Sequence, residues 1–146
     1  MDDPQIEEIP GHTPDLAAML AEAGLPTNDL AEPGRRFFRF SERGEVVGFI
    51  GWETADGQIA LLRSLVVAPH RRGRGDGAQM IRWALTRLAE LGFTDAYMLT
   101  TTIAELARRQ GFAPTDRVAA PASIRQSRQF AALCPATAIL LHRNLP

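Results

Sequence analysis

Apolar and polar positions along the chain follow two alternating rhythms. Short apolar or β-branched runs bounded by turn residues are typical of strands, whereas apolar residues spaced three and four apart are typical of helices. Strands are expected at Gln5–Ile9, Arg36–Phe40, Glu45–Thr54, Gln58–Val67, Asp95–Thr100 and Ala136–Arg143. Helices are expected from Thr13 or Pro14 to Gly24, at Leu25–Leu30, at Gly75–Leu91, from Thr102 to Gly111 and at Pro121–Phe130.

Two of these helices carry specific signals. The helix Gly75–Leu91 has an apolar stripe at helical spacing and is closed by Gly92. The stripe comprises Ala78, Ile81, Leu85, Leu88 and Leu91. Thr102 and Glu105 have the spacing of a capping box, in which each side chain satisfies a free backbone amide at the start of a helix.

The dipeptide Asp56-Gly57 predicts a hairpin, and its length sets the pairing of the two flanking strands. A two-residue turn places Glu53 opposite Ala60, on the face that also carries Ser64. Arg63 then lies on the other face. An ion pair between Glu53 and Arg63 is therefore not expected unless a bulge resets the register.

Alternating strands and helices around a central strand–loop–helix predict an α/β fold, a mixed sheet flanked by helices, in one domain over residues 1–146. The chain is 45% hydrophobic and 23% charged, as in ordinary globular proteins, and its net charge of −1 argues against nucleic acid or a membrane surface as partner. One cysteine and no long apolar run favour a cytoplasmic location. The apolar run Ala138–Leu141 is compatible with a monomer or a homodimer.

The segment Leu61–Gly77 is the most informative part of the chain. A buried strand ends at Pro69, and a loop rich in glycine and arginine then opens a helix. The first backbone amides of a helix lack partners within the helix and favour negative charge. Glycines allow close approach to the backbone, and arginines bind phosphate by charge-assisted hydrogen bonds. The segment therefore predicts a phosphate or diphosphate site, although its spacing does not match the dinucleotide or P-loop motifs.

Residues 72–77, Arg-Gly-Arg-Gly-Asp-Gly, follow Val67-Ala68-Pro69, and Gly111-Phe112 comes later in the chain. This set resembles the acetyl-CoA motif of the GNAT superfamily of N-acetyltransferases, and the resemblance implies a mixed, mostly antiparallel sheet. It also implies that backbone amides hold the diphosphate of acetyl-CoA and that a strand edge pairs with the pantetheine arm. The residues implied in cofactor binding are Leu65, Val66, Val67, Arg72, Gly73, Arg74, Gly75, Asp76, Gly77 and Ala78. Asp76 departs from the usual apolar residue.

An ammonium group must lose a proton before it can attack a thioester, so such an enzyme needs a route for that proton. Glu53 is the candidate general base, and Ser64 could hold a water; the alternatives are a solvated glutamate and a satisfied core hydroxyl. Arg63 is a candidate ligand for an anionic group of the acceptor, or else a structural arginine. Ala107 occupies the position where many family members carry a tyrosine that protonates the leaving thiolate. The only tyrosine of the chain, Tyr97, is expected in the core.

The run Thr100-Thr101-Thr102 together with Phe130–Ala136 resembles a branch of small GNAT proteins associated with arsenic resistance. That resemblance implies a small amine acceptor, amino-acid-like or arsenic-containing, with Cys134 as a candidate contact to the substrate. A lone cysteine is more often a small buried apolar residue. The three histidines are scattered, and no metal site is expected.

The sequence thus predicts an acetyl-CoA-dependent N-acetyltransferase in which a small primary amine attacks directly within a ternary complex. Two alternatives stay open. One is a protein or peptide N-acetyltransferase, which needs an open groove. The other is a CoA-binding regulatory domain without catalysis, which is favoured by the alanine at position 107.

Overall fold

The computed structural model of the protein describes residues 4–133 and 137–146. Its centre is a seven-stranded sheet in the order β1-β2-β3-β4-β5-β7-β6. The strands are β1 Gln5–Ile9, β2 Arg35–Glu42, β3 Glu45–Asp56, β4 Ile59–Val67, β5 Asp95–Thr100, β6 Ala113–Pro114 and β7 Ile139–Asn144. Every pairing is antiparallel except the one between β4 and β5. The expected mixed, mostly antiparallel sheet is confirmed.

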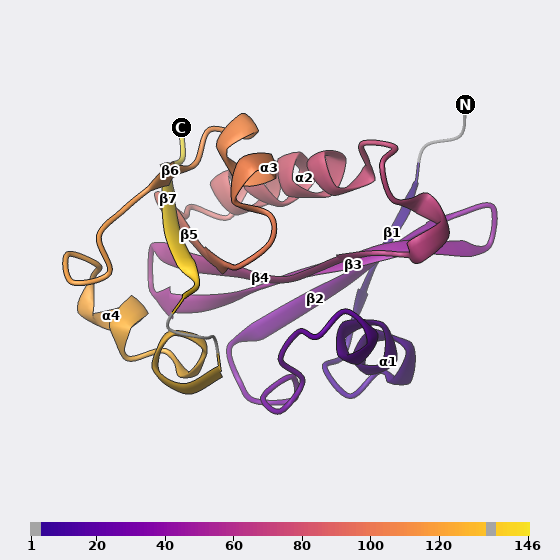
Figure 1. Cartoon of the computed structure of the whole chain (residues 1–146), viewed down its shortest axis with the longest axis horizontal. Coiled ribbons are helices and arrows are strands. Elements are labelled where there is room, and N and C mark those ends of the chain that lie inside the picture. Colours follow the sequence, from indigo (N-terminus) through magenta and orange to yellow (C-terminus); the bar gives the residue numbers. More distant parts are fainter. Residues whose placement is uncertain (1–3, 134–136) are drawn as a thin grey trace.

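Helices cover both faces of this sheet (Figure 1). Their bounds are α1 Pro14–Glu22, α2 Asp76–Glu90, α3 Ala104–Arg109 and α4 Ala122–Arg125, with a 3-10 turn at Pro69–Arg71 and a π-helical turn at Gln129–Leu133. Helices α2 and α3 lie over one face, and α1 and α4 lie over the other (Figure 1). The larger apolar cluster lies between α2 and the sheet, and two smaller ones lie under α1 and α4.

Helix α2 buries most of the predicted apolar stripe. Ile81, Leu85 and Leu88 are buried in the larger cluster, together with Met80. Leu91 was expected in the stripe, but it is 41% exposed because the helix ends at Glu90 and the chain turns away at Gly92. The helical spacing of apolar residues thus predicted the buried face of α2 correctly except at Leu91, the last residue of the stripe.

The predicted register of the β3–β4 hairpin is wrong by one residue. The turn begins one residue later than expected, with Asp56 opposite Ile59, and the Asp56 side chain accepts a hydrogen bond from the amide of Gln58 at 3.1 Å. A bulge between Thr54 and Asp56 then places Glu53 opposite Leu61. Glu53 and Arg63 therefore share a face, and the ion pair that the simple turn excluded is formed.

Three other expectations fail locally. Leu25–Leu30 is not a helix: Pro26 supplies no amide, and turns begin at Asn28. The capping box is absent, because Ile103 caps α3 and the hydroxyl of Thr100 accepts from the amides of Thr102 and Ile103. The helix expected at Pro121–Phe130 is divided into α4 and the π-helical turn.

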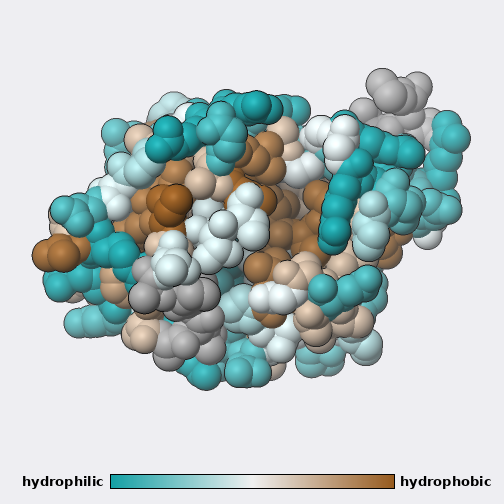
Figure 2. Space-filling view, in the orientation of Figure 1, coloured by the Kyte–Doolittle hydropathy of each residue, from teal (hydrophilic) through white to brown (hydrophobic). Residues whose placement is uncertain are grey.

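The start of the last strand, expected at Ala136, lies outside the described residues, and β7 begins at Ile139. In the described part of the chain, no helix has the length and apolar character needed to cross a membrane. Hydrophobic surface gathers across the middle of one face, between two hydrophilic regions (Figure 2). In the orientation shared with Figure 1, this is the region where β4 and β5 part.

Candidate active site

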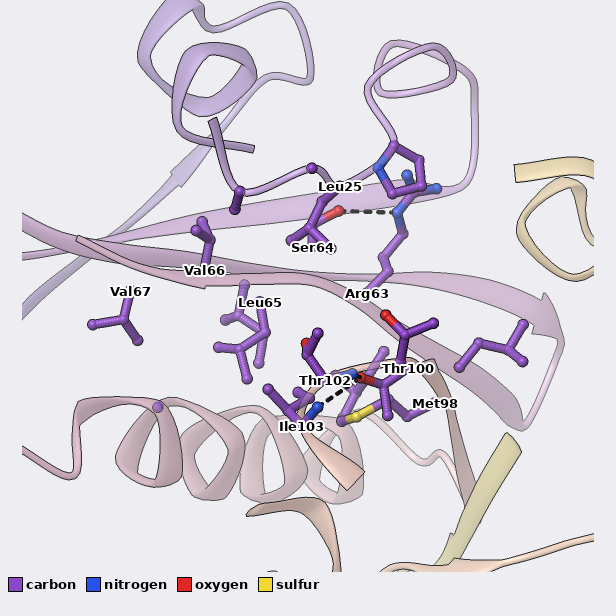
Figure 3. Close-up of a pocket in the computed structure, with 18 of the residues that line it drawn as sticks. Leu25, Arg63, Ser64, Leu65, Val66, Val67, Met98, Thr100, Thr102 and Ile103 are labelled. Carbon is purple, nitrogen blue, oxygen red and sulfur yellow. Dashed lines mark hydrogen bonds between the residues drawn. The ribbon is translucent and has the colours of Figure 1, made fainter. Parts of the chain in front are cut away.

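Strands β4 and β5 open a gap in the middle of the sheet. They pair in parallel only from Ile59–Leu62 against Asp95–Met98, and beyond Leu62 the far edge of β4 has no partner strand. A cavity of about 590 Å³ fills the space between Leu65 and Val67 on one side and Thr100 to Ile103 on the other. Figure 3 shows Thr102 and Ile103 lying across the cavity from Leu65. The open strand edge thus becomes the wall of a pocket.

One end of the cavity lies at the start of α2, where Arg72 and Gly77 line it. Gly75 precedes the helix with a φ of 84°, and Gly73 has a φ of 81°. A side chain at either position would meet no atom of the protein within 4 Å, so the space above the backbone is open. The first amide bonded within this turn is that of Gln79, which donates to the carbonyl of Gly75 at 3.1 Å. The loop therefore offers free amides to an anion.

Asp76 does not present an isolated carboxylate to this loop. Arg71 contacts it through both Nε and Nη2 at 3.2 Å, and Nη2 also contacts Glu42 at 3.1 Å. The hydrogen bonds of Asp76, and then those of Glu42, raise the pKa of Arg71 above its usual value. The charge of Asp76 is thus balanced within the protein, and the departure from the usual apolar residue is accommodated.

The other end of the cavity begins at a second bulge, in β4. Phe49 pairs with Val66 and Gly51 with Arg63, so β4 has one residue more than β3 between these pairs. Ser64 adopts a φ of 59°, which is uncommon outside glycine. Its side chain points toward Leu25 and contacts Arg63, whereas Leu65 points to the opposite side of the strand (Figure 3). The bulge thereby sets two consecutive polar side chains beside the cavity.

Arg63 is held in a buried network of charges. Its Nη1 and Nη2 contact the two carboxylate oxygens of Asp29 at 2.6 and 2.7 Å, Nη1 contacts Glu53 at 3.0 Å, and Nε donates to Ser64 at 3.1 Å. Arg35 contacts Asp29 at 3.0 Å and Glu53 at 3.4 Å. The side chains of Arg63 and Asp29 are fully buried. Two carboxylates and two guanidinium groups thus neutralise one another.

Burial by itself would raise the pKa of Asp29, because a carboxylate loses its hydration. Hydrogen bonds and charges from Arg63 and then Arg35 outweigh burial, so the pKa of Asp29 lies below its usual range. Asp29 was not among the residues singled out by the sequence, because it lies in a segment expected to be helical. No local signal marks it.

The predicted site residues are distributed unevenly around the cavity. Arg63, Ser64, Leu65, Val66, Val67, Arg72 and Gly77 line it. Gly73, Arg74, Gly75, Asp76 and Ala78 belong to the loop and the first turn of α2 beside it. Glu53 lies behind Arg63, with a side chain only 6% exposed, and it does not line the cavity. Cys134 lies outside the described residues.

The two residues discussed for proton transfer to the thiolate are both buried. Ala107 lies in the apolar cluster under α2. Tyr97 packs under α4 and against His142, with tilted rings whose centroids are 4.6 Å apart, and it does not line the cavity. Within residues 4–133 and 137–146, no group of three or more histidine, cysteine, aspartate or glutamate side chains could hold a metal ion.

Free amides at a helix start, joined by a cavity to a buried polar end, suit a ligand that carries an anionic group at one end. The sequence profile of the GNAT acetyltransferase family matches residues 5–113. The chain belongs to this family. No curated protein matches the chain significantly.

Solved structures share the fold at low sequence identity. N-acetylglutamate synthase from Neisseria gonorrhoeae, complexed with coenzyme A and N-acetyl-glutamate, superposes with a TM-score of 0.75 at 19% identity over 99% of this chain. The chain spans only 36% of that enzyme. Rv2747 from Mycobacterium tuberculosis, in complex with CoA and NLQ, gives a TM-score of 0.79 at 16% identity over 98% of this chain and 100% of its own. A GNAT family acetyltransferase from Elizabethkingia anophelis with acetyl-CoA bound gives 0.74 at 16% identity, covering 99% and 100%.

Proposed function

We propose that the protein transfers the acetyl group of acetyl-CoA to the primary amine of a small molecule. The cavity of about 590 Å³ that runs from the glycine loop past the open edge of β4 carries this proposal. Its size suits the thioester end of the donor together with a compact acceptor rather than a folded polypeptide. When bound, acetyl-CoA supplies an activated acyl group as a thioester.

The residues of the donor end fit this cofactor. Backbone amides of Gly75 to Ala78 would hold the diphosphate, since Gly73 and Gly75 leave open space above the main chain. Arg72 lines the cavity beside them and supplies positive charge. The edge of β4 from Leu65 to Val67 has no partner strand, and it would bind the pantetheine arm through main-chain hydrogen bonds and present an amide donor to the thioester carbonyl.

At the acceptor end, Ser64 is the polar group next to the open strand edge. Its Oγ accepts from Arg63, so its own proton is free for a water or for the acceptor. We assign Glu53 to the positioning of Arg63 rather than to direct contact with the amine, because Arg63 and Arg35 surround its carboxylate. A water held by Ser64 would then pass the proton of the amine on to bulk solvent. The thiolate leaves as an anion, because its parent thiol has a pKa of about 8.5.

The chemical class of the acceptor is proposed from similar proteins rather than from the cavity itself. Two of the similar structures contain N-acetyl-glutamate or NLQ. The threonine run at the end of β5 and the segment around Cys134 resemble an arsenic-associated branch. A small amino-acid-like amine, including an arsenic-containing one, is therefore the acceptor that we propose for a soluble, cytoplasmic enzyme, as a monomer or homodimer.

The test joins binding to turnover. Calorimetry with acetyl-CoA measures the donor site, and thiol release is then followed over a panel of amino acids, polyamines, arsenic-containing amino acids and short peptides. Tight binding and release with a small amine support the proposal. Binding without release for any amine would identify a regulatory domain, and release with peptides alone would identify a peptide acetyltransferase.

A further inference from the structure

The acceptor end of the cavity contains a buried polar atom whose hydrogen-bonding capacity is unused. Gln129 lines the cavity and is buried, and its side-chain oxygen Oε1 has no hydrogen-bond partner. Among the described residues it is the only buried side-chain nitrogen or oxygen atom in this condition. Burying an amide oxygen without a partner destabilises a protein, so such an atom calls for an explanation.

The position of Gln129 places it away from the donor loop. It begins the π-helical turn Gln129–Leu133, a type of turn that often occurs at functional sites. The residue before it, Arg128, forms a salt bridge with Glu32, in the loop that supplies Asp29. The turn and this loop therefore meet at the end of the cavity where Arg63 and Ser64 lie. Phe130 anchors the turn by packing against the cluster under α4.

The charges nearest Arg63 and Gln129 are paired within the protein. Three of the described residues that line the cavity ionise: Arg72 at the donor loop, Arg63 within its network, and Glu22 at the end of α1. Asp29 and Glu53 face Arg63, Glu32 faces Arg128, and Arg117 stacks on the ring of Phe130 at 4.6 Å. An acceptor amine beside Gln129 meets its neutral side-chain oxygen, whereas Glu22, at the end of α1, is the one carboxylate among the described residues that line the cavity.

We infer that Oε1 of Gln129 accepts a hydrogen bond from the reacting amine and so positions the acceptor nitrogen. This inference rests on the proposed acetylation in the cavity. A neutral acceptor suits the chemistry, because a carboxylate in its place would raise the pKa of the amine and hold it protonated. The amide fixes the nitrogen while leaving it able to lose its proton.

The test compares Gln129→Leu and Gln129→Glu with wild type, using the amine of the panel that gives the fastest thiol release. Gln129→Leu should lower kcat/KM for that amine by about tenfold or more and leave the KM for acetyl-CoA unchanged. Its melting temperature without ligands should equal or exceed that of wild type, because the unpaired oxygen is gone. Gln129→Glu should shift the acid limb of the pH profile of kcat/KM to higher pH. Gln126→Leu, an exposed glutamine of the same segment, is the matched control.

Two results would overturn the inference. One is an unchanged kcat/KM for the amine in Gln129→Leu. The other is a melting temperature several degrees lower, with kinetic constants for both substrates impaired together and no pH shift in Gln129→Glu, which would make Gln129 structural. Failure of the proposed function has a separate signature, namely a wild-type protein that releases no thiol with any amine.

Discussion

The two ends of the cavity are built in different ways. The donor end is a continuous stretch of main chain, in which Gly73, Gly75 and the first turn of α2 present amides to an anion. The acceptor end is assembled from side chains far apart in sequence, with Asp29 and Glu53 around Arg63 and with Gln129 lining the same cavity. A main-chain site tolerates much variation in its side chains, whereas a site made of interlocked charges depends on each partner.

The largest effect is expected from removing a carboxylate of the buried network. Asp29→Ala leaves Arg63 buried without its bidentate partner, and the free energy of unfolding should fall by about 3–5 kcal/mol. Asp15→Ala is the control, because Asp15 pairs with Arg39 near the surface, and it should lower that free energy by no more than about 1 kcal/mol. Urea unfolding of both variants measures this; equal losses would show that burial of the network matters little.

A substitution in the donor loop should separate binding from stability. Gly75→Val and Gly92→Val both force a side chain into a left-handed backbone conformation, at φ of 84° and 93°, at opposite ends of α2. Each should lower stability by at least about 1 kcal/mol. Only Gly75→Val should also weaken acetyl-CoA binding, by about tenfold or more, measured by calorimetry. Equal acetyl-CoA affinity in the two variants would contradict the placement of the diphosphate at this loop.

The network should also respond to acid. The pKa of Asp29 is lowered in the folded protein, so its contribution to stability is present above the unfolded pKa of about 3.9. That contribution is lost as the pH falls through the lower, folded value. Unfolding free energies measured from pH 7 down to pH 2 should therefore decline more steeply below about pH 4 in wild type than in Asp29→Asn. Parallel curves would contradict the assignment.

Glu53→Gln tests whether the carboxylate behind Arg63 positions or reacts. A positioning role predicts that kcat falls by less than about tenfold while the pH profile of kcat keeps its shape, because the amide still contacts Arg63. Loss of two or more orders of magnitude, with the acid limb abolished, would instead make Glu53 the general base.

The smallest effect is expected at the rim of the acceptor end. Glu32→Gln weakens the contact with Arg128, but this pair is partly exposed, so the free energy of unfolding should change by less than about 1 kcal/mol. Thermal unfolding measures this change. A loss as large as that of Asp29→Ala would mean that the rim, rather than the buried network, holds the acceptor end together.

The strand and the helix of the donor end could be predicted from the sequence because their signals are local. A strand, a proline, spaced glycines and an amphipathic helix are all visible within residues 61–91. The acceptor end could not be predicted, since one inserted residue in β3 changed which face carries Glu53, and the partner of Arg63 came from a loop taken for a helix. Gln129 belongs to a helix whose interruption near Ser127 no pattern indicated. Pairing at a distance depends on register and on bulges, which short-range periodicity does not determine.

The central claim is that backbone amides at the start of α2 hold the diphosphate of acetyl-CoA. Amide chemical shifts of labelled protein during titration with acetyl-CoA test it most directly. The amides of Gly73 and of Gly75 to Ala78 should shift most and saturate together with binding. Binding that leaves these amides unmoved while others shift would contradict it.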